Sequence, residues 1–249
     1  DVDGDGDLDA WVANRDEGNT VWINAGDGSF TDSGQDLGFR ASFSVALGDV
    51  DGDDDLDAWV ANYAGDPDLV WINDGNGFFT SSGQLLGDDY SSSVALGDLD
   101  QDGDLDAWVT NYLGPDVIWI NDGSGGFTDS GQALGGDRSF SVALGDIDAD
   151  GDPDAWIAND DDPNTVWINL VQGACCVDGL CLPLQADFCQ NIGGLYLGGR
   201  CSDVTCPKPK PIGACCVTTG CDQLTEETCD RLGGTWLRRG SCDDCPPVC

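Results

Sequence analysis

The sequence predicts an all-β protein that consists of β-propeller blades followed by two small disulfide-rich modules. Acidic loops begin at Asp1, Asp49, Asp98 and Asp146, so a unit repeats after 48, 49 and 48 residues. Short runs of β-branched and aromatic residues flank the loops, and no helical periodicity separates these runs. A period of this length with several strands per unit is typical of propeller blades. All 13 cysteines follow residue 171, which indicates a second region of different architecture.

Each unit is predicted to form up to four strands. In the second unit the first strand covers 42–48, and an acidic loop at 49–57 leads into a second strand at 58–62. A third strand covers 70–73, and a turn rich in Gly, Asp and Asn leads to a fourth strand near 78–80. The first unit lacks the first strand and the fourth unit lacks the last one. The units are therefore expected to contain 3, 4, 4 and 3 strands, 14 in all.

The two incomplete units leave open how the blades close. Propellers typically close with about four to eight blades, and closure protects the strand edges. The chain is expected to be a piece of a longer protein, or to receive strands from neighbouring copies in an oligomer or filament. Closure of four blades alone is the least favoured arrangement.

The acidic loops predict metal sites. Each loop has Asp at positions 1, 3, 5, 7 and 9 of nine residues. Two unit charges about 5 Å apart repel by roughly 3 kcal/mol at an effective dielectric of about 20, so a folded loop of this composition needs a cation. Oxygen ligands in this number suit Ca²⁺, whereas Mg²⁺ prefers a tight octahedron and keeps its waters. We expect about four Ca²⁺, one per loop, at Asp1, Asp3, Asp5, Asp7, Asp9, Asp49, Asp51, Asp53, Asp55, Asp57, Asp98, Asp100, Asp102, Asp104, Asp106, Asp146, Asp148, Asp150, Asp152 and Asp154.

An EF-hand is the rival interpretation of the same acidic run. It requires a bidentate Glu at position 12 and flanking helices. Position 12 is occupied by Val12, Val60, Val109 and Ile157, so the sequence excludes it.

The loops and their flanking strands, on a unit that ends near Gly-x-Phe, resemble the FG-GAP/VCBS repeats of integrin-α-like calcium-binding β-propellers. The resemblance covers residues 1–170 approximately. It implies one Ca²⁺ between the first and second strands of each blade. It also implies that position 7 contributes its backbone carbonyl, here from Asp7, Asp55, Asp104 and Asp152, and that the Asp residues at positions 1, 3, 5 and 9 contribute side chains.

Position 6 of the loop is expected to have positive φ, which favours Gly. Gly6, Gly103 and Gly151 fit this expectation, whereas the second loop has Asp54. Since Asp tolerates this conformation better than most residues do, we expect the second site to be strained but occupied.

The composition restricts the function. Residues 1–171 contain 38 acidic and 3 basic residues, a net charge of −35 within a total of −38, which argues against binding nucleic acid or an anionic membrane surface. Disorder is disfavoured because 40% of the residues are hydrophobic. The sequence contains no apolar run long enough to span a membrane. It also contains no His and nominates no catalytic or cofactor-binding residue, so an enzyme is not expected.

Two Trp residues recur in every unit, and two interpretations compete. Large rings fill the space between blades, and strict repetition favours this core role. A platform that stacks on sugars is the alternative. The Trp residues are Trp11, Trp59, Trp108 and Trp156 on the second strands, and Trp22, Trp71, Trp119 and Trp167 on the third strands.

The tail is predicted to form cysteine-rich modules at 172–206 and 213–249, joined by an extended Pro/Lys linker at 207–212. Modules this small need disulfides, and a zinc site is disfavoured because His is absent. The pairing stays open, and the odd cysteine indicates an intermolecular bond or a longer array. The tail resembles small cysteine-rich repeats of bacterial exported proteins. Its cysteines are Cys175, Cys176, Cys181, Cys189, Cys201, Cys206, Cys215, Cys216, Cys221, Cys229, Cys242, Cys245 and Cys249.

These features predict a secreted or cell-surface protein, because disulfides persist in oxidising compartments. The expected function is that of a calcium-stabilised structural or adhesive protein, self-assembling into an oligomer or filament through its incomplete blades. The alternative is a lectin-like module of a larger secreted protein that binds an extracellular glycan or protein.

Overall fold

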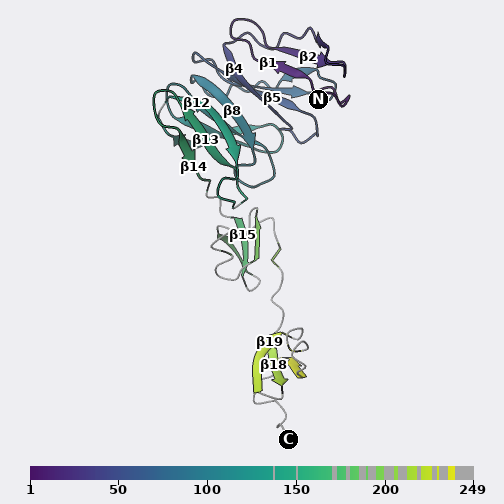
Figure 1. The fold of residues 1–249 in the computed structure, drawn as a ribbon, viewed down its shortest axis with the longest axis vertical. Coiled ribbons are helices and arrows are strands. Elements are labelled where there is room, and N and C mark those ends of the chain that lie inside the picture. The colour runs from purple at the N-terminus through teal and green to yellow at the C-terminus, as the bar shows by residue number, and fades with distance from the viewer. Residues whose placement is uncertain are drawn as a thin grey trace.

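The computed structural model describes nearly all of the repeat region and the strands of the tail, at residues 1–136, 138–149, 151–169, 173–177, 180–184, 189, 195–198, 205–206, 212–217, 220–225, 229 and 235–238. The repeat region forms four antiparallel sheets of 3, 4, 4 and 3 strands, side by side in one body (Figure 1). The predicted strand count and order are therefore confirmed. No helix among the described residues is long and apolar enough to cross a membrane.

We call the four sheets blades 1 to 4. Blade 1 consists of β1 (Ala10–Val12), β2 (Thr20–Asn24) and β3 (Phe30–Asp32). Blade 2 consists of β4 (Ser42–Gly48), β5 (Asp57–Asn62), β6 (Leu69–Asn73) and β7 (Phe79–Ser81). Blade 3 consists of β8 (Ser91–Gly97), β9 (Asp106–Asn111), β10 (Asp116–Asn121) and β11 (Phe127–Leu134). Blade 4 consists of β12 (Ser139–Gly145), β13 (Asp154–Asn159) and β14 (Thr165–Trp167).

The strand β5 shows why these sequences form blades. All six of its residues are buried, and successive side chains of a strand point to opposite faces. Ala58 and Val60 join a hydrophobic cluster with residues of blade 1. Trp59 and Ala61 join a second cluster with residues of blade 3. A short apolar run is thus explained by burial on both faces of one sheet.

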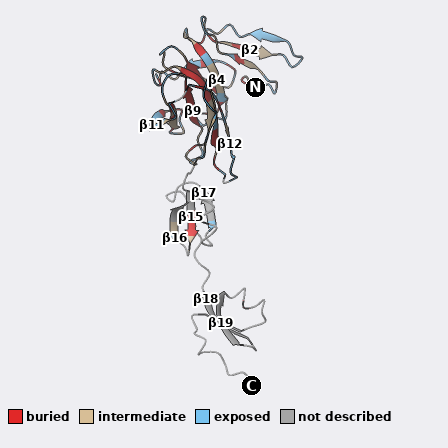
Figure 2. Cartoon of the chain, turned by 60° about the vertical axis from the view of Figure 1, so that its left-hand side comes forward, coloured by how far each residue is buried: buried red, intermediate tan, exposed pale blue. Residues whose placement is uncertain are grey.

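Aromatic pairs link blade 1 to blade 2 and blade 2 to blade 3. Trp59 meets Phe127 of blade 3 edge to face, with 4.6 Å between ring centroids. Trp11 meets Phe79 of blade 2 in the same orientation at 6.2 Å. Such edge-to-face contacts stabilise beyond the area that they bury. Buried residues therefore run through the middle of the four-blade body (Figure 2).

The core role predicted for the Trp residues holds for those on the second strands of blades 1 to 3, whereas Trp22 on the third strand of blade 1 is 37% exposed. Trp11, Trp59 and Trp108 are buried, whereas the equivalent Trp156 of blade 4 is 52% exposed. No further sheet among the described residues covers this face of blade 4. The exposure of Trp156 thus follows from its place at the end of the row of blades.

Each tail module contains a three-stranded sheet. The first sheet is β16-β15-β17 and the second is β19-β18-β20. Their strands are β15 (Gly173–Val177), β16 (Leu180–Leu184), β17 (Leu195–Gly198), β18 (Ile212–Val217), β19 (Gly220–Thr225) and β20 (Thr235–Arg238).

Disulfides are present in the tail. They join Cys175 to Cys189 and Cys176 to Cys206, with Cα atoms 5.7 and 5.3 Å apart. Cys181 and Cys229 are disulfide-bonded as well. The remaining predicted disulfide residues, whose backbone or side chains lie outside the described residues, are Cys201, Cys215, Cys216, Cys221, Cys242, Cys245 and Cys249.

A buried carboxylate lies between blades 2 and 3. Asp68 accepts a hydrogen bond from the backbone N–H of Asn62 at 2.7 Å and is almost fully buried. Burial raises the pKa of Asp68 to about 8, although hydrogen bonds from Asn62 and Ser91 oppose the shift and the nearby Asp89 adds to it. Blade 1 has Asn19 in the same role, since it accepts a hydrogen bond from Asn14 N–H.

We expect Asp68→Asn to stabilise the protein increasingly as the pH rises from 5 to 9. A raised pKa means that the folded state favours protonated Asp68. The wild type therefore loses stability as pH climbs from the unfolded pKa towards about 8. Each pKa unit corresponds to about 1.4 kcal/mol. Thermal unfolding of both proteins with Ca²⁺ present measures the gap, and a gap that is constant across this pH range would contradict the expectation.

Candidate metal centres

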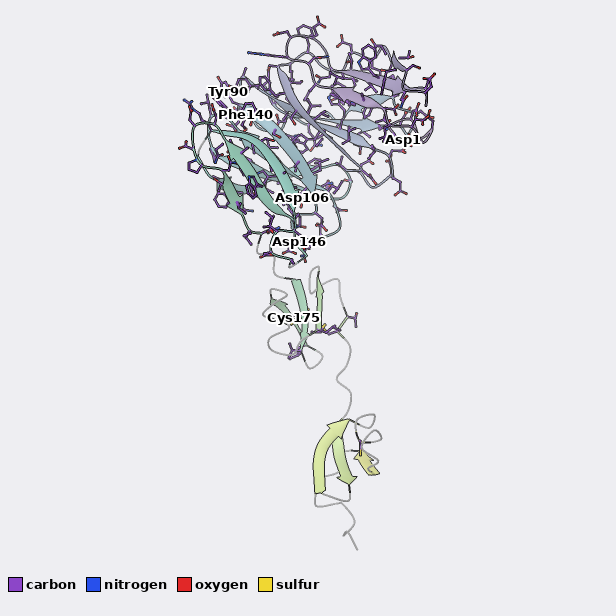
Figure 3. All side chains as sticks on the ribbon, in the orientation of Figure 1. Asp1, Tyr90, Asp106, Phe140, Asp146 and Cys175 are labelled. Atoms are coloured by element: carbon purple, nitrogen blue, oxygen red, sulfur yellow. A yellow bond between two sulfur atoms is a disulfide. The ribbon has the colours of Figure 1, made fainter. Side chains whose placement is uncertain are left out.

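The acidic loops bring carboxylate oxygens together in all four units. One oxygen from each of three Asp side chains lies within 4.8 Å of the others in every loop. Figure 3 labels Asp1, Asp106 and Asp146, one from each of three loops. The clusters are Asp1, Asp3 and Asp5; Asp49, Asp51 and Asp53; Asp98, Asp100 and Asp106; and Asp146, Asp148 and Asp154.

The carboxylate at position 1 accepts hydrogen bonds from backbone N–H groups of its own loop. In the second loop, Asp49 Oδ1 accepts a hydrogen bond from Gly52 N–H at 2.8 Å, and Asp49 Oδ2 accepts one from Asp54 N–H at 2.9 Å. Asp53 accepts a hydrogen bond from Asp55 N–H. These short-range bonds make a tight turn that directs the acidic side chains inward.

The carboxylate at position 9 connects the loop to the rest of its blade. Asp57 is fully buried and accepts hydrogen bonds from Val50 N–H at 3.0 Å and Asn73 N–H at 2.8 Å. It therefore ties the start of the loop to the end of β6. The other three loops repeat the pair of bonds, to Asp9 from Val2 and Asn24, to Asp106 from Leu99 and Asn121, and to Asp154 from Ile147 and Asn169.

The electrostatics of the clusters favour a cation. Burial raises the pKa of Asp57 and of Asp106 to about 6, and neighbouring carboxylates contribute to both shifts. Burial and then the charge of Asp53 also raise the pKa of Asp51. Oδ1 of Asp51 is buried and accepts no hydrogen bond among the described residues, and the same is true of Oδ1 of Asp1. Buried oxygens without a donor and crowded negative charge fit a hard cation with oxygen ligands.

The side chain at position 7 lies outside the clusters. The Asp55 carboxylate lies against Gly75, where a Cβ atom would approach the Asp55 carboxyl carbon to 3.0 Å. Gly75 also has a φ of 76°, so both space and backbone conformation favour glycine. Asp104 lies against Gly123 in the same manner.

The four clusters do not use the same loop positions, since those of the first two loops lack the residue at position 9, Asp9 or Asp57. In the third loop the oxygen cluster contains Asp106 instead of Asp102, the residue at position 5. Asp150 of the fourth loop lies outside the described residues.

Sequence reasoning identified one of two left-handed positions in the loop. Asp54 at position 6 has a φ of 72°, as expected. Position 4 is also left-handed in every loop, including at Gln101 and Ala149, where φ is 60° and 65°. Gly at position 4 of the first two loops indicates this left-handed conformation, but the third and fourth loops have other residues there, so the pattern was not recognised.

We expect Asp54→Gly to stabilise the protein by about 1 kcal/mol, because Gly adopts positive φ without the steric cost of a Cβ atom. The Asp54 N–H bond to Asp49 is retained in the variant. Thermal unfolding in Ca²⁺ tests this, with Gly103→Asp as the reverse substitution at the equivalent position. A stabilising effect of Gly103→Asp would contradict the reasoning.

Each of the first three loops also accepts a hydrogen bond from the following blade. Asn73 Nδ2 donates a hydrogen bond to the Val2 carbonyl at 2.8 Å. Asn121 donates in the same way to Val50, and Asn169 to Leu99, both at 2.8 Å. A change in loop structure would therefore affect the contact between neighbouring blades.

Comparison with protein families agrees with this arrangement. Residues 1–60 and residues 49–109 each match the family of FG-GAP-like repeats. The chain is therefore similar to FG-GAP-like repeats over residues 1–109. The matched segments of these FG-GAP-like repeats include the first three acidic loops, and residues 110–169 continue the same order of elements. No curated protein matches the chain.

An aromatic cluster lies at the strand ends opposite the acidic loops, where Figure 3 labels Tyr90 and Phe140. Tyr63 stacks on Phe43 with centroids 4.5 Å apart and meets Tyr90 edge to face at 5.0 Å. Phe43 and Tyr63 line a cavity of about 300 Å³ together with Arg15, Tyr112, Phe140 and Asp160. Sequence reasoning missed this cluster because its members are single aromatic residues spread over several units.

Proposed function

We propose that this chain is an extracellular binding or structural module of adhesive type whose blades are stabilised by Ca²⁺. FG-GAP-like repeats and disulfides fit an extracellular location. The four carboxylate clusters fit about four Ca²⁺, one in each loop. The residues that would hold the ions are those of the clusters, and the ions would neutralise part of the charge that the loops concentrate.

The observation that carries an assembly role is the presence of two uncovered blade faces. On blade 4, Trp156, Val166 and Ile168 are each more than 40% exposed. On blade 1, Trp22 and Phe30 are 37% and 47% exposed. The equivalents of these residues pack between blades within the chain, as Trp59 and Phe127 do.

A second copy fits these faces, because blade 1 of one copy can pack on blade 4 of another as blade 3 packs on blade 2. Contacts between different faces of identical chains produce rings or filaments. The proposed partner is therefore another copy of this chain, in an oligomer or filament at the cell surface or outside the cell.

Sedimentation velocity over a concentration series, with Ca²⁺ present, tests the assembly. The wild type is expected to form oligomers and Trp156→Ser is expected to remain monomeric. Thr80→Ala, an exposed substitution on β7, serves as a control. A wild type that remains monomeric at every concentration would refute self-assembly.

The aromatic cavity favours a second candidate function, a lectin-like module. Exposed aromatic rings beside Arg15 and Asp160 provide stacking surfaces and hydrogen-bonding groups of the kind that small polar ligands need. A glycan array probed with the wild type and with Tyr63→Ala tests this. We expect hits that the substitution removes, and an array without hits contradicts this candidate.

A further inference from the structure

A groove of about 410 Å³ lies beside β14, between blades 3 and 4. Trp108, Gln132, Leu134, Trp167 and Asn169 contribute to its lining. Among the described strands β14 is the last of its sheet, whereas β6 and β10 each pair with one more strand. The groove therefore lies where blades 2 and 3 carry β7 and β11.

The equivalent positions of the other blades are filled by phenylalanine. Phe127 of β11 packs edge to face on Trp59, and Phe79 of β7 packs likewise on Trp11. Both Phe residues are buried. Trp108 occupies the place of Trp59 in the groove, so the groove has the aromatic wall of a Phe site.

A glutamine side chain forms two hydrogen bonds to the backbone of each segment that carries one of these Phe residues. Gln84 Nε2 donates to the Gly125 carbonyl at 2.6 Å, and Gln84 Oε1 accepts from Phe127 N–H at 2.9 Å. Gln35 makes the same two bonds, to the Gly77 carbonyl at 2.7 Å and from Phe79 N–H at 2.8 Å.

Gln132 is the equivalent residue in the groove. Its backbone N–H donates to Ser130, and its side-chain amide makes no hydrogen bond to any residue that the structure describes. The side-chain amide of Gln132 thus offers the groove one donor and one acceptor. The same groups of Gln35 and Gln84 form hydrogen bonds to a strand backbone in the two preceding blades.

The strand register places an incoming Phe at this site. Asn121 pairs with Phe127, and Asn73 pairs with Phe79. Asn169 is their equivalent, and its bond to Leu99 repeats the bond of Asn121 to Val50. The strand β14 therefore has the same position in blade 4 as β10 has in blade 3. A strand that pairs with β14 in this register would place its Phe against Trp108.

The glycine two residues before Phe is part of the recognition. Gly125 and Gly77 have φ of 73° and 74°. A Cβ atom on Gly125 would lie 3.4 Å from Asp51 Cβ and 3.5 Å from Ile72 Cδ1. These are ordinary van der Waals distances, but the positive φ would strain any side chain there, so a ligand strand favours Gly at this place.

We propose that the groove binds an extended strand with the sequence Gly-x-Phe, supplied by another protein, as an additional strand of blade 4. The Gly-x-Phe segments that end at Phe30, Phe79 and Phe127 are each paired within their own sheets, so they do not supply this strand. The inference rests on the proposed role as a binding module and names the chemistry of a partner. It does not require the face-to-face self-assembly described above.

A fluorescent peptide with the sequence of residues 121–131 is the probe, titrated into the full chain with Ca²⁺ and followed by anisotropy. We expect saturable binding to the wild type, and loss of binding when Ala replaces the Phe of the peptide. Gln132→Ala is expected to weaken binding about tenfold, the change that loss of two hydrogen bonds produces. Gln132 is exposed, so the variant is expected to fold, and Thr80→Ala should bind as the wild type does.

Two results would overturn the proposal. One is absence of saturable binding up to about 1 mM peptide, a concentration that detects even weak complexes. The other is self-association that Gln132→Ala abolishes, which would assign the groove to a second copy. Self-association that is lost in Trp156→Ser but retained in Gln132→Ala concerns the blade faces alone, so the two proposals fail independently.

Discussion

Removal of Ca²⁺ with a chelator at neutral pH is expected to lower the Tm of the protein by more than about 10 °C. Each loop gathers three carboxylate oxygens within 4.8 Å, and these charges repel one another without a cation. A site at 100 times its Kd contributes about 2.7 kcal/mol. Four sites would thus contribute about 10 kcal/mol, and 1 kcal/mol shifts Tm by about 2–4 °C in a chain of this size.

The loss of Ca²⁺ should also loosen the contacts between blades. The Val2, Val50 and Leu99 carbonyls, which belong to the first three loops, accept hydrogen bonds from the following blades. Near-ultraviolet circular dichroism, which reports on packed Trp side chains, should therefore change together with Tm. Re-addition of Ca²⁺ should restore both signals more completely than Mg²⁺ does, because loose oxygen cages suit Ca²⁺. An unchanged Tm after chelation would refute the calcium proposal.

The repeat made much of the fold predictable. The run 58–61 is short, apolar and repeated, and a sheet buried on both faces requires such a run. The loops were equally clear, because Asp at alternate positions has few explanations besides a metal site. The structure adds that Asp57 is tied to the strands through Val50 and Asn73, which depends on residues distant in sequence.

The features that escaped prediction depend on neighbours instead of local pattern. Trp156 follows Asp-Ala and precedes an apolar residue, Ala and Asn, as Trp59 does, yet only Trp59 lies between two described sheets. Gln132 resembles Gln84 in sequence, yet only Gln84 meets a partner strand. Repetition specifies what each blade can contact, whereas position in the row specifies what it does contact. The disulfide between Cys175 and Cys189 also escaped prediction, because the pairing of cysteines follows from the fold and not from their spacing in the sequence.

The difference in burial between Trp59 and Trp156 predicts a large difference in stability between substitutions at these two positions. Trp59→Ala should destabilise the protein by about 3–5 kcal/mol, because it removes a fully buried ring from the interface between blades. The substitution leaves a cavity beside Phe127, whose ring meets Trp59 at 4.6 Å. A decrease in Tm of about 10 °C follows for a chain of this size. Thermal unfolding at low protein concentration with Ca²⁺ measures it.

Trp156→Ala is the matched control, since it changes the same residue type at the equivalent strand position. At low concentration it should cost less than about 1 kcal/mol, because half of the ring is already exposed to water. If blade 1 of a second copy covers this face, the cost should grow with protein concentration, whereas that of Trp59→Ala should not. Equal costs for the two substitutions at every concentration would mean that burial between blades does not determine the stability of this protein.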